Sequence, residues 1–426
     1  MKVLSSRQLA NHRILRKIAI LTFICILVLH GTFLRARPGL VTPAVDWLVV
    51  GRLLACAVGF AVGIILIPKN RPLGFGAKML LLYACATAIS AATSPYAAVV
   101  FGYFILLLGG SVLMIALTYR ARGVVDLQTI EKVWFLTIVV LIIKDTATSL
   151  LFPEMAPPGE VVRLGMGVTH ANQLSLLSVL VFWLSFRQRR TKHPILLPIM
   201  LWLLRAFLIY VIVGARSRVS VTAFLLGGLV YLLFASRDYL RRWVVVSAGV
   251  GALSTFFLLS LCFDQGWAKD VAGYARRGQE RAALTTLTGR TLIWQHALGK
   301  SSESPITGHG YAVTRLTMGE VPHLRFQPYH CHNAVLEVFF STGLLGIIPF
   351  LLILMYSLKW IKSFSRLRRA FSTDLALHAL CCVVIVLVSS LFEPRLAGKL
   401  DPVQPLFFFY LLILDRERNF LDLQRI

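Results

Sequence analysis

The stretch from Tyr329 to Glu337 carries the residues best suited to moving a proton, because it reads Tyr-His-Cys-His-Asn-Ala-Val-Leu-Glu. An imidazole titrates near neutral pH, so His330 or His332 could take the proton of an attacking hydroxyl group. The alternative is a hydrogen-bonded structural histidine. Side chains two residues apart point in different directions on a helix, so the pair does not predict a zinc site there. We predict a general base in this stretch and no metal.

Arginines at two further places could bind a phosphate group. The segment Gly-Ala-Arg-Ser-Arg places Arg216 and Arg218 at the start of an apolar run, and Arg290 begins a predicted amphipathic helix. The N-terminus of a helix already carries partial positive charge, and a guanidinium group can bind phosphate or pyrophosphate in bidentate fashion. The alternatives are an interfacial arginine that extends to water and, for Arg290, an ordinary surface residue.

Four other residues are weaker candidates for contact with the substrate that the histidines and arginines would bind. Gly308 and Gly310 follow Pro305 in Pro-Ile-Thr-Gly-His-Gly, which predicts a turn where backbone can approach a ligand closely, although a turn needs no ligand. Asn172 and Glu393 lie near the predicted outer ends of apolar runs. We expect these four residues to contact substrate.

The cysteines predict no metal centre, because no C-x-x-C or H-E-x-x-H spacing occurs. Most of the seven lie in apolar runs, where a thiol behaves as a small hydrophobic group. Cys262 and Cys331 lie at the two ends of one polar stretch and could pair in an oxidising compartment.

The elements that position these residues must be membrane-spanning helices. Of the 426 residues, 57% are hydrophobic and 15% charged, whereas soluble domains carry about 25% charge. A nucleic-acid-binding protein would explain the net charge of +25 but not the hydrophobicity. A span needs about 20 apolar residues. We expect an all-α, polytopic membrane protein with about twelve spans, near residues 18–34, 46–67, 77–93, 97–118, 131–152, 172–186, 194–213, 219–235, 243–263, 334–358, 375–392 and 403–415.

Basic segments alternate with less charged ones along this series, which predicts the orientation of the chain. Short loops rich in lysine and arginine stay in the cytoplasm, so both termini are expected inside. Roughly +19 of the net charge then faces the cytoplasm and is an insertion signal. The predicted organisation is nine spans in residues 1–263, a large periplasmic loop with amphipathic helices in 264–333, and three spans with a cytoplasmic tail in 334–426.

The order and spacing of these pieces resemble the O-antigen ligase/polymerase family of membrane glycosyltransferases. The resemblance covers roughly residues 160–400 and rests on Gly165 to Asn172, Ser217-Arg218, Thr288-Gly-Arg-Thr-Leu-Ile-Trp294, Pro305-x-x-Gly308-x-Gly310, His332-Asn-Ala-Val-Leu-Glu337, Gly343-Leu-Leu-Gly346 and Glu393. His332 directly precedes asparagine and Arg218 directly follows serine, as the family pattern has them, so these two are preferred over His330 and Arg216.

The resemblance implies an enzyme of the bacterial inner membrane that uses a glycan on undecaprenyl pyrophosphate and needs no cofactor, metal or nucleotide sugar. The acceptor is the lipid A–core in ligases and another lipid-linked repeat unit in polymerases of surface polysaccharide or exopolysaccharide. We expect Arg218 and Arg290, with Arg216, to hold the pyrophosphate. His332 would act as the base, with inversion at the anomeric carbon. Asn333 and His330 would contact substrate.

A rival from another class is a transporter or flippase of lipid-linked saccharides, which twelve spans would also suit. Such a protein should show inverted or parallel repeats with polar residues at mid-membrane in both halves, and the sequence shows no such repeat. The choice between ligase and polymerase stays open, because the shape of the cavity selects the acceptor.

Overall fold

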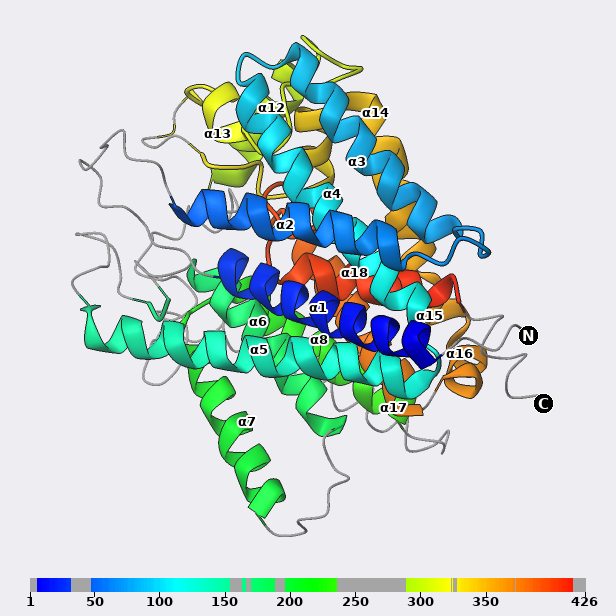
Figure 1. Cartoon of the computed structure of the whole chain (residues 1–426). Helices are drawn as coiled ribbons and strands as arrows, with labels where there is room; N and C mark the ends of the chain where they lie inside the picture. The colour runs from blue at the N-terminus through cyan, green and yellow to red at the C-terminus, as the bar shows by residue number, and fades with distance from the viewer. Residues whose placement is uncertain are drawn as a thin grey trace, which may run out of the picture. The chain divides into compact units, whose positions relative to one another are not determined.

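The structure is a computed structural model that describes residues 6–31, 47–153, 163–165, 170–187, 196–235, 289–322, 324, 328–371 and 373–416 (Figure 1). Every regular element in these ranges is a helix. The all-α class predicted from the sequence is therefore confirmed.

Eight helices of the described part are long and apolar enough to cross a membrane. They match predicted spans and are α1 (Ser6–Gly31), α2 (Trp47–Leu66), α3 (Phe75–Thr93), α4 (Ala97–Arg120), α5 (Val124–Leu151), α7 (Leu196–Gly214), α8 (Arg218–Ala235) and α14 (Ala334–Ser357). Shorter apolar helices match three further runs: α6 (Ala171–Leu184), α17 (Thr373–Ser390) and α18 (Val403–Leu414). The predicted span at 243–263 lies outside the described residues. The chain is a multi-pass membrane protein.

One compact unit consists of Met1–Leu141, Leu292–Ser372 and Ser390–Ile426. In Figure 1, α3 runs along α14, and α2 crosses α4. A Cβ at Gly109 of α4 would lie 2.2 Å from the carbonyl oxygen of Cys56, so glycine lets these two helices meet at backbone distance. Every residue of α18 is buried, and the helix packs against α3, α4 and α14. The remaining helices of this unit are short: most of α12 (Arg290–Ser301), α13 (Thr314–Thr317), α15 (Lys359–Lys362) and α16 (Phe364–Ala370).

The second unit consists of Ile142–Thr291 and Thr373–Ser389. Its centre is α6, whose residues are all buried and which contacts α7 and α8. The guanidinium group of Arg205, within α7, has protein partners in this unit. It donates to Ser185 Oγ at 2.9 Å and to the Ser185 carbonyl oxygen at 3.1 Å. Its Cζ also lies 4.0 Å from the centroid of the Phe186 ring. A buried arginine with these partners needs no ligand to explain it.

Candidate functional site

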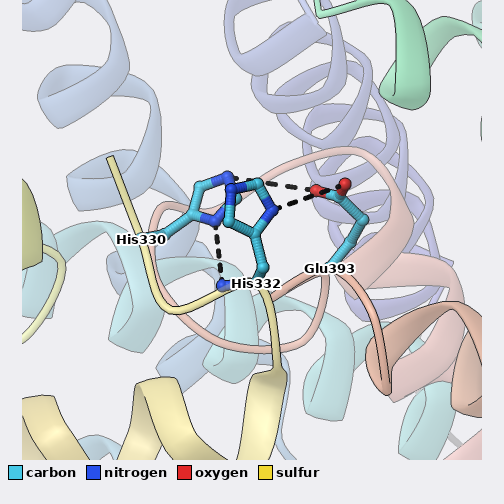
Figure 2. A group of neighbouring side chains, drawn as sticks. All are labelled: His330, His332 and Glu393. Carbon is cyan, nitrogen blue, oxygen red and sulfur yellow. Dashed lines mark hydrogen bonds and ion pairs between the residues drawn. The ribbon is translucent and has the colours of Figure 1, made fainter. Parts of the chain in front are cut away.

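His330 and His332 lie in a loop that directly precedes α14, not on a helix. His332 has a φ of 52°, a left-handed conformation that is uncommon for a residue with a side chain. The loop brings the two imidazoles together, with ring centroids 4.1 Å apart (Figure 2). The expectation that the two side chains would diverge, which assumed a helix, therefore does not apply.

The backbone of the histidine loop is fixed from two sides. The Cys331 N–H donates to Glu337 Oε2 at 2.7 Å, and Trp294 Nε1 donates to the Cys331 carbonyl oxygen at 2.8 Å. Thr314 Oγ1 donates to the other oxygen of Glu337 at 2.5 Å. Both oxygens of Glu337 thus hold backbone and neighbouring side chains in place. This explains a glutamate near the start of a spanning helix, where burial of a carboxylate is otherwise costly.

Asn333 joins the histidine loop to the segment that carries Glu393. Its Oδ1 accepts a hydrogen bond from the Leu336 N–H at 2.9 Å, which caps the N-terminus of α14. Its Nδ2 donates to the Leu391 carbonyl oxygen at 3.0 Å. The asparagine side chain therefore has a clear structural role, and its predicted contact with substrate stays a prediction.

Glu393 faces both histidines. Its side chain is 2% exposed, and its oxygens lie 3.9 Å from His330 Nε2 and 3.8 Å from His332 Nδ1 (Figure 2). Burial alone would raise the pKa of the Glu393 carboxyl. The facing imidazoles and the Arg395 guanidinium outweigh burial and hold this pKa well below its usual range. The carboxylate therefore stays ionised and orients Nδ1 of His332 toward itself, which leaves Nε2 of that ring for a hydroxyl group.

Arg395 and Asp401 complete this group. Arg395 lies 3.5 Å from Glu393 and 3.8 Å from Asp401. Asp401 Oδ1 also accepts from the Val403 N–H at 2.8 Å, at the start of α18. Burial raises the pKa of Asp401 to about 6, although Arg395 and the backbone N–H groups oppose the rise. Asp401 is not among the residues identified from the sequence, where the available signal is an acidic residue two positions before the last apolar run.

Cys331 has a buried, free thiol, and Cys262 lies outside the described residues. Burial and the nearby Glu337 carboxylate raise the pKa of this thiol well above its usual value. Because the thiolate is the nucleophilic form, Cys331 is not suited to attack a substrate.

The two glycine motifs pack against each other backbone to backbone. Helix α14 is interrupted at Gly343, whose φ is 58° and ψ −154°. The Gly310 N–H donates to the Ser341 carbonyl oxygen at 2.9 Å, and the Leu344 N–H donates to the Pro305 carbonyl oxygen at 2.8 Å. A Cβ at Gly308 would lie 2.4 Å from the backbone of Ser341. Gly308 and Gly310 thus have a structural reason to be glycine, and their predicted contact with substrate stays a prediction.

Gly343→Ala is expected to destabilise the protein, because only glycine readily adopts this backbone conformation, at a strain of about 1–3 kcal/mol for other residues. The new Cβ would also lie 2.4 Å from the Ile306 carbonyl oxygen. Thermal unfolding of the detergent-purified protein should therefore occur at a lower temperature. Gly299→Ala is the matched control, because a Cβ there meets nothing within 4 Å. Equal unfolding temperatures for both variants would contradict the packing described above.

The second group of candidates is cationic and lies in the other unit. Arg218 is the first residue of α8 and Arg290 the first residue of α12. The charges of Arg290 and Arg163 both act on Arg218, which is also partly buried, so each of these two guanidinium groups lies within electrostatic range of Arg218. Guanidinium groups placed near one another can bind a phosphate group in bidentate fashion. Arg163 was not identified from the sequence, since it lies in a short polar segment without a motif.

Local structure explains how the arginines are placed. Gly289 has a φ of 82° and turns the chain directly before Arg290, and Arg216 is left-handed with a φ of 48° between α7 and α8. The Ser220 N–H donates to Ser217 Oγ at 3.4 Å, at the start of α8.

Asn172 and Arg163 both belong to the second unit, where separate contacts position the backbone around each of them. The Asn172 carbonyl oxygen accepts from Ser220 Oγ at 3.5 Å, and its side chain is buried. Beside Arg163, the Leu164 N–H donates to the Gly214 carbonyl oxygen at 3.1 Å and the Gly165 N–H to Ser149 Oγ at 3.0 Å. This short segment therefore lies between the end of α5 and the end of α7.

The predicted site residues thus form two groups, one in each unit. His330, His332, Asn333 and Glu393 meet in the first unit, where an imidazole, an orienting carboxylate and buried polar partners suit proton transfer. Arg218 and Arg290 meet in the second unit, where clustered guanidinium groups suit binding of a phosphate.

Comparison with known proteins adds independent information. Residues 203–351 match the family described as O-Antigen ligase (Wzy_C). A stretch of 98 residues is 32% identical to the "Exopolysaccharide production protein ExoQ" of Rhizobium meliloti (strain 1021) and covers 21% of each chain. The match therefore spans about a fifth of the length of that relative.

Proposed function

We propose that this chain is a glycosyltransferase of the O-antigen ligase/polymerase kind, and the match of residues 203–351 to the O-Antigen ligase family supports this proposal. The donor is a glycan on undecaprenyl pyrophosphate, and the acceptor is a hydroxyl group at the periplasmic face of the bacterial inner membrane. The observation that carries this proposal is that Arg163 and Arg290 both lie within electrostatic range of Arg218, because guanidinium groups so placed can bind a pyrophosphate.

The arginines would act on the leaving group. As the bond between the anomeric carbon and the pyrophosphate oxygen breaks, negative charge grows on that oxygen. Guanidinium groups already in place stabilise this charge without reorganising, which is the usual source of the largest catalytic effect. The pyrophosphate is a good leaving group, so positioning and electrostatics supply most of the acceleration.

An open groove in the same unit suits the lipid part of the donor. It has a volume of about 420 Å³, lies between α5 and α7, and is lined by Ile143, Thr146, Ala147, Leu150, Leu203, Leu204 and Phe207. The segment that holds Arg163 contacts the ends of these same helices, at Ser149 and Gly214. An isoprenoid chain in the groove would therefore lead toward the arginines that hold its pyrophosphate.

His332 would activate the acceptor. Nε2 of His332 takes the proton of the acceptor hydroxyl group. The hydroxyl oxygen forms a bond to the anomeric carbon on the side opposite the pyrophosphate. The electron pair of the broken bond leaves with the pyrophosphate, and the configuration inverts. Glu393 holds the ring through Nδ1 and stabilises the imidazolium that forms, as a carboxylate does in other histidine-dependent enzymes.

The acceptor that we favour is a lipid-linked repeat unit, so that the reaction polymerises an exopolysaccharide. The support is the printed name of the relative, an exopolysaccharide production protein. Ligation to the lipid A–core is the alternative within the same chemistry. Both termini are placed in the cytoplasm in this proposal, because the basic loops alternate along the chain.

The test is a transfer assay with the purified full-length chain in lipid vesicles and no energy source. We expect a glycan on undecaprenyl pyrophosphate to be converted to free carrier pyrophosphate and a longer lipid-linked glycan. Lipid A–core added in place of the second repeat unit should give little product. Movement of intact donor across the vesicle membrane without any product would favour a flippase and contradict the proposal.

A further inference from the structure

We propose that His330, His332 and Glu393 form a binding site for Zn²⁺ or a similar transition-metal ion. The bound ion would engage the imidazole of His332, the proposed base, and so reversibly stop glycan transfer. Binding itself depends only on the geometry of these three residues, whereas the inhibition rests on the proposed function.

The distances suit a metal ion after a small adjustment. One ligand atom from each of the three residues lies within 4.8 Å of the others. The carboxylate lies 3.9 Å from His330 and 3.8 Å from His332. Ligands of a tetrahedral Zn²⁺ lie about 2.0–2.1 Å from the ion, hence about 3.3 Å from one another. The two carboxylate–imidazole pairs reach that spacing after closing by roughly half an ångström, and the widest pair of ligand atoms, at up to 4.8 Å, after closing by about 1.5 Å.

The chemistry of the three side chains also fits. Two imidazoles and one carboxylate are a set that Zn²⁺ takes with a fourth position left for water. The histidine side chains are 24% and 23% exposed, so an ion can reach them, while the carboxylate is buried at 2%. Asn333 and the backbone contacts of Cys331 hold the loop in place. These contacts hold the loop that carries both histidine ligands before an ion binds.

Two features oppose permanent occupancy. Arg395 lies 3.5 Å from Glu393 Oε2, and its charge repels a divalent cation. His330 Nδ1 accepts from the His332 N–H at 3.2 Å, so a metal ion at Nε2 would move the imidazole proton to Nδ1 and break this hydrogen bond. We therefore infer an exchangeable, inhibitory site and not a resident cofactor.

The experiment measures binding first. The full-length chain, purified with a tag that contains no histidine and washed with chelator, is titrated with Zn²⁺ by calorimetry and with Co²⁺ by visible absorption. We expect one saturable site, with affinity at least about tenfold weaker in His330→Ala and in Glu393→Gln. Elution profiles on size exclusion show that each variant is folded. His296→Ala is the matched control, since that ring contacts the Met318 carbonyl oxygen in the same region of the chain.

Absence of saturable binding would overturn the site, as would unchanged affinity in both variants or an equal loss in the His296 control. In the transfer assay, Zn²⁺ should inhibit and chelator should restore the rate. Saturable binding without inhibition would overturn the inhibitory part. A chelated protein that never transfers glycan counts against the proposed function alone, because the titrations decide the metal site independently.

Discussion

His332→Ala is expected to lower the rate of glycan transfer by a factor of about 10²–10⁴, the usual contribution of a positioned general base. Glu393 faces Nδ1 of the imidazole at 3.8 Å, and the variant removes the group that would accept the hydroxyl proton. The rate is measured under single-turnover conditions with saturating donor, so that the change reports the chemical step. Affinity for the donor should stay close to that of the wild type.

Two neighbouring variants sharpen this result. Glu393→Gln keeps the size of the side chain but removes its charge, and it should cost about 10–100-fold, as loss of an orienting partner does. His330→Ala should have a smaller effect than His332→Ala. A folded His332→Ala protein with full transfer activity would exclude the base role. The opposite ranking of the two histidines would assign that role to His330.

Arg218→Ala and Arg290→Ala are each expected to lower transfer by about 10²–10³-fold, the effect of removing one group that stabilises charge in the transition state. Unlike His332→Ala, both should also weaken binding of undecaprenyl pyrophosphate. The lysine variants should recover only part of the loss, because an ammonium group cannot bind a phosphate in bidentate fashion. Binding is measured with the carrier pyrophosphate alone in detergent.

Arg366→Ala is the matched control, because this arginine in α16 lies outside both groups and contacts Ser363. It should leave binding and transfer unchanged. Undiminished binding of the carrier pyrophosphate in both Arg218→Ala and Arg290→Ala would contradict the arginine role. The comparison also separates two functions: loss of binding is expected for the arginine variants and loss of chemistry alone for the histidine variant.

The membrane-spanning helices could be predicted from the sequence because the signal for a span is local. A run of apolar residues long enough to cross the bilayer needs no knowledge of its neighbours. The two shortest predicted spans became α6 and α18, of 14 and 12 residues, and both are wholly buried. Their apolar character reflects burial among other helices, which hydropathy alone cannot distinguish from contact with lipid.

The candidate site could be predicted only as a set of residues. His332 and Arg218 were preferred from the resemblance, but the approach of Glu393 to both histidines depends on contacts between segments distant in sequence. The turn with Gly308 and Gly310 is predicted from the sequence as backbone that approaches a ligand, whereas the structure shows its backbone approaching the backbone of Ser341. A glycine in the sequence indicates that another group comes close to the backbone, but it does not say whether that group is a ligand or another part of the chain.

The interruption of α14 at Gly343 also fixes the register of the histidine loop. Pro305 and Gly310 form hydrogen bonds with the backbone on either side of the interruption, so the position of each residue in the N-terminal part of α14 is fixed relative to Gly343. One residue inserted between Asn333 and Gly343 would rotate the histidine loop by about 100° and shift it by about 1.5 Å along the axis. Asn333 would then lose the Leu391 carbonyl oxygen, and the imidazoles would turn away from Glu393. The contacts at its two ends therefore fix the length of this segment.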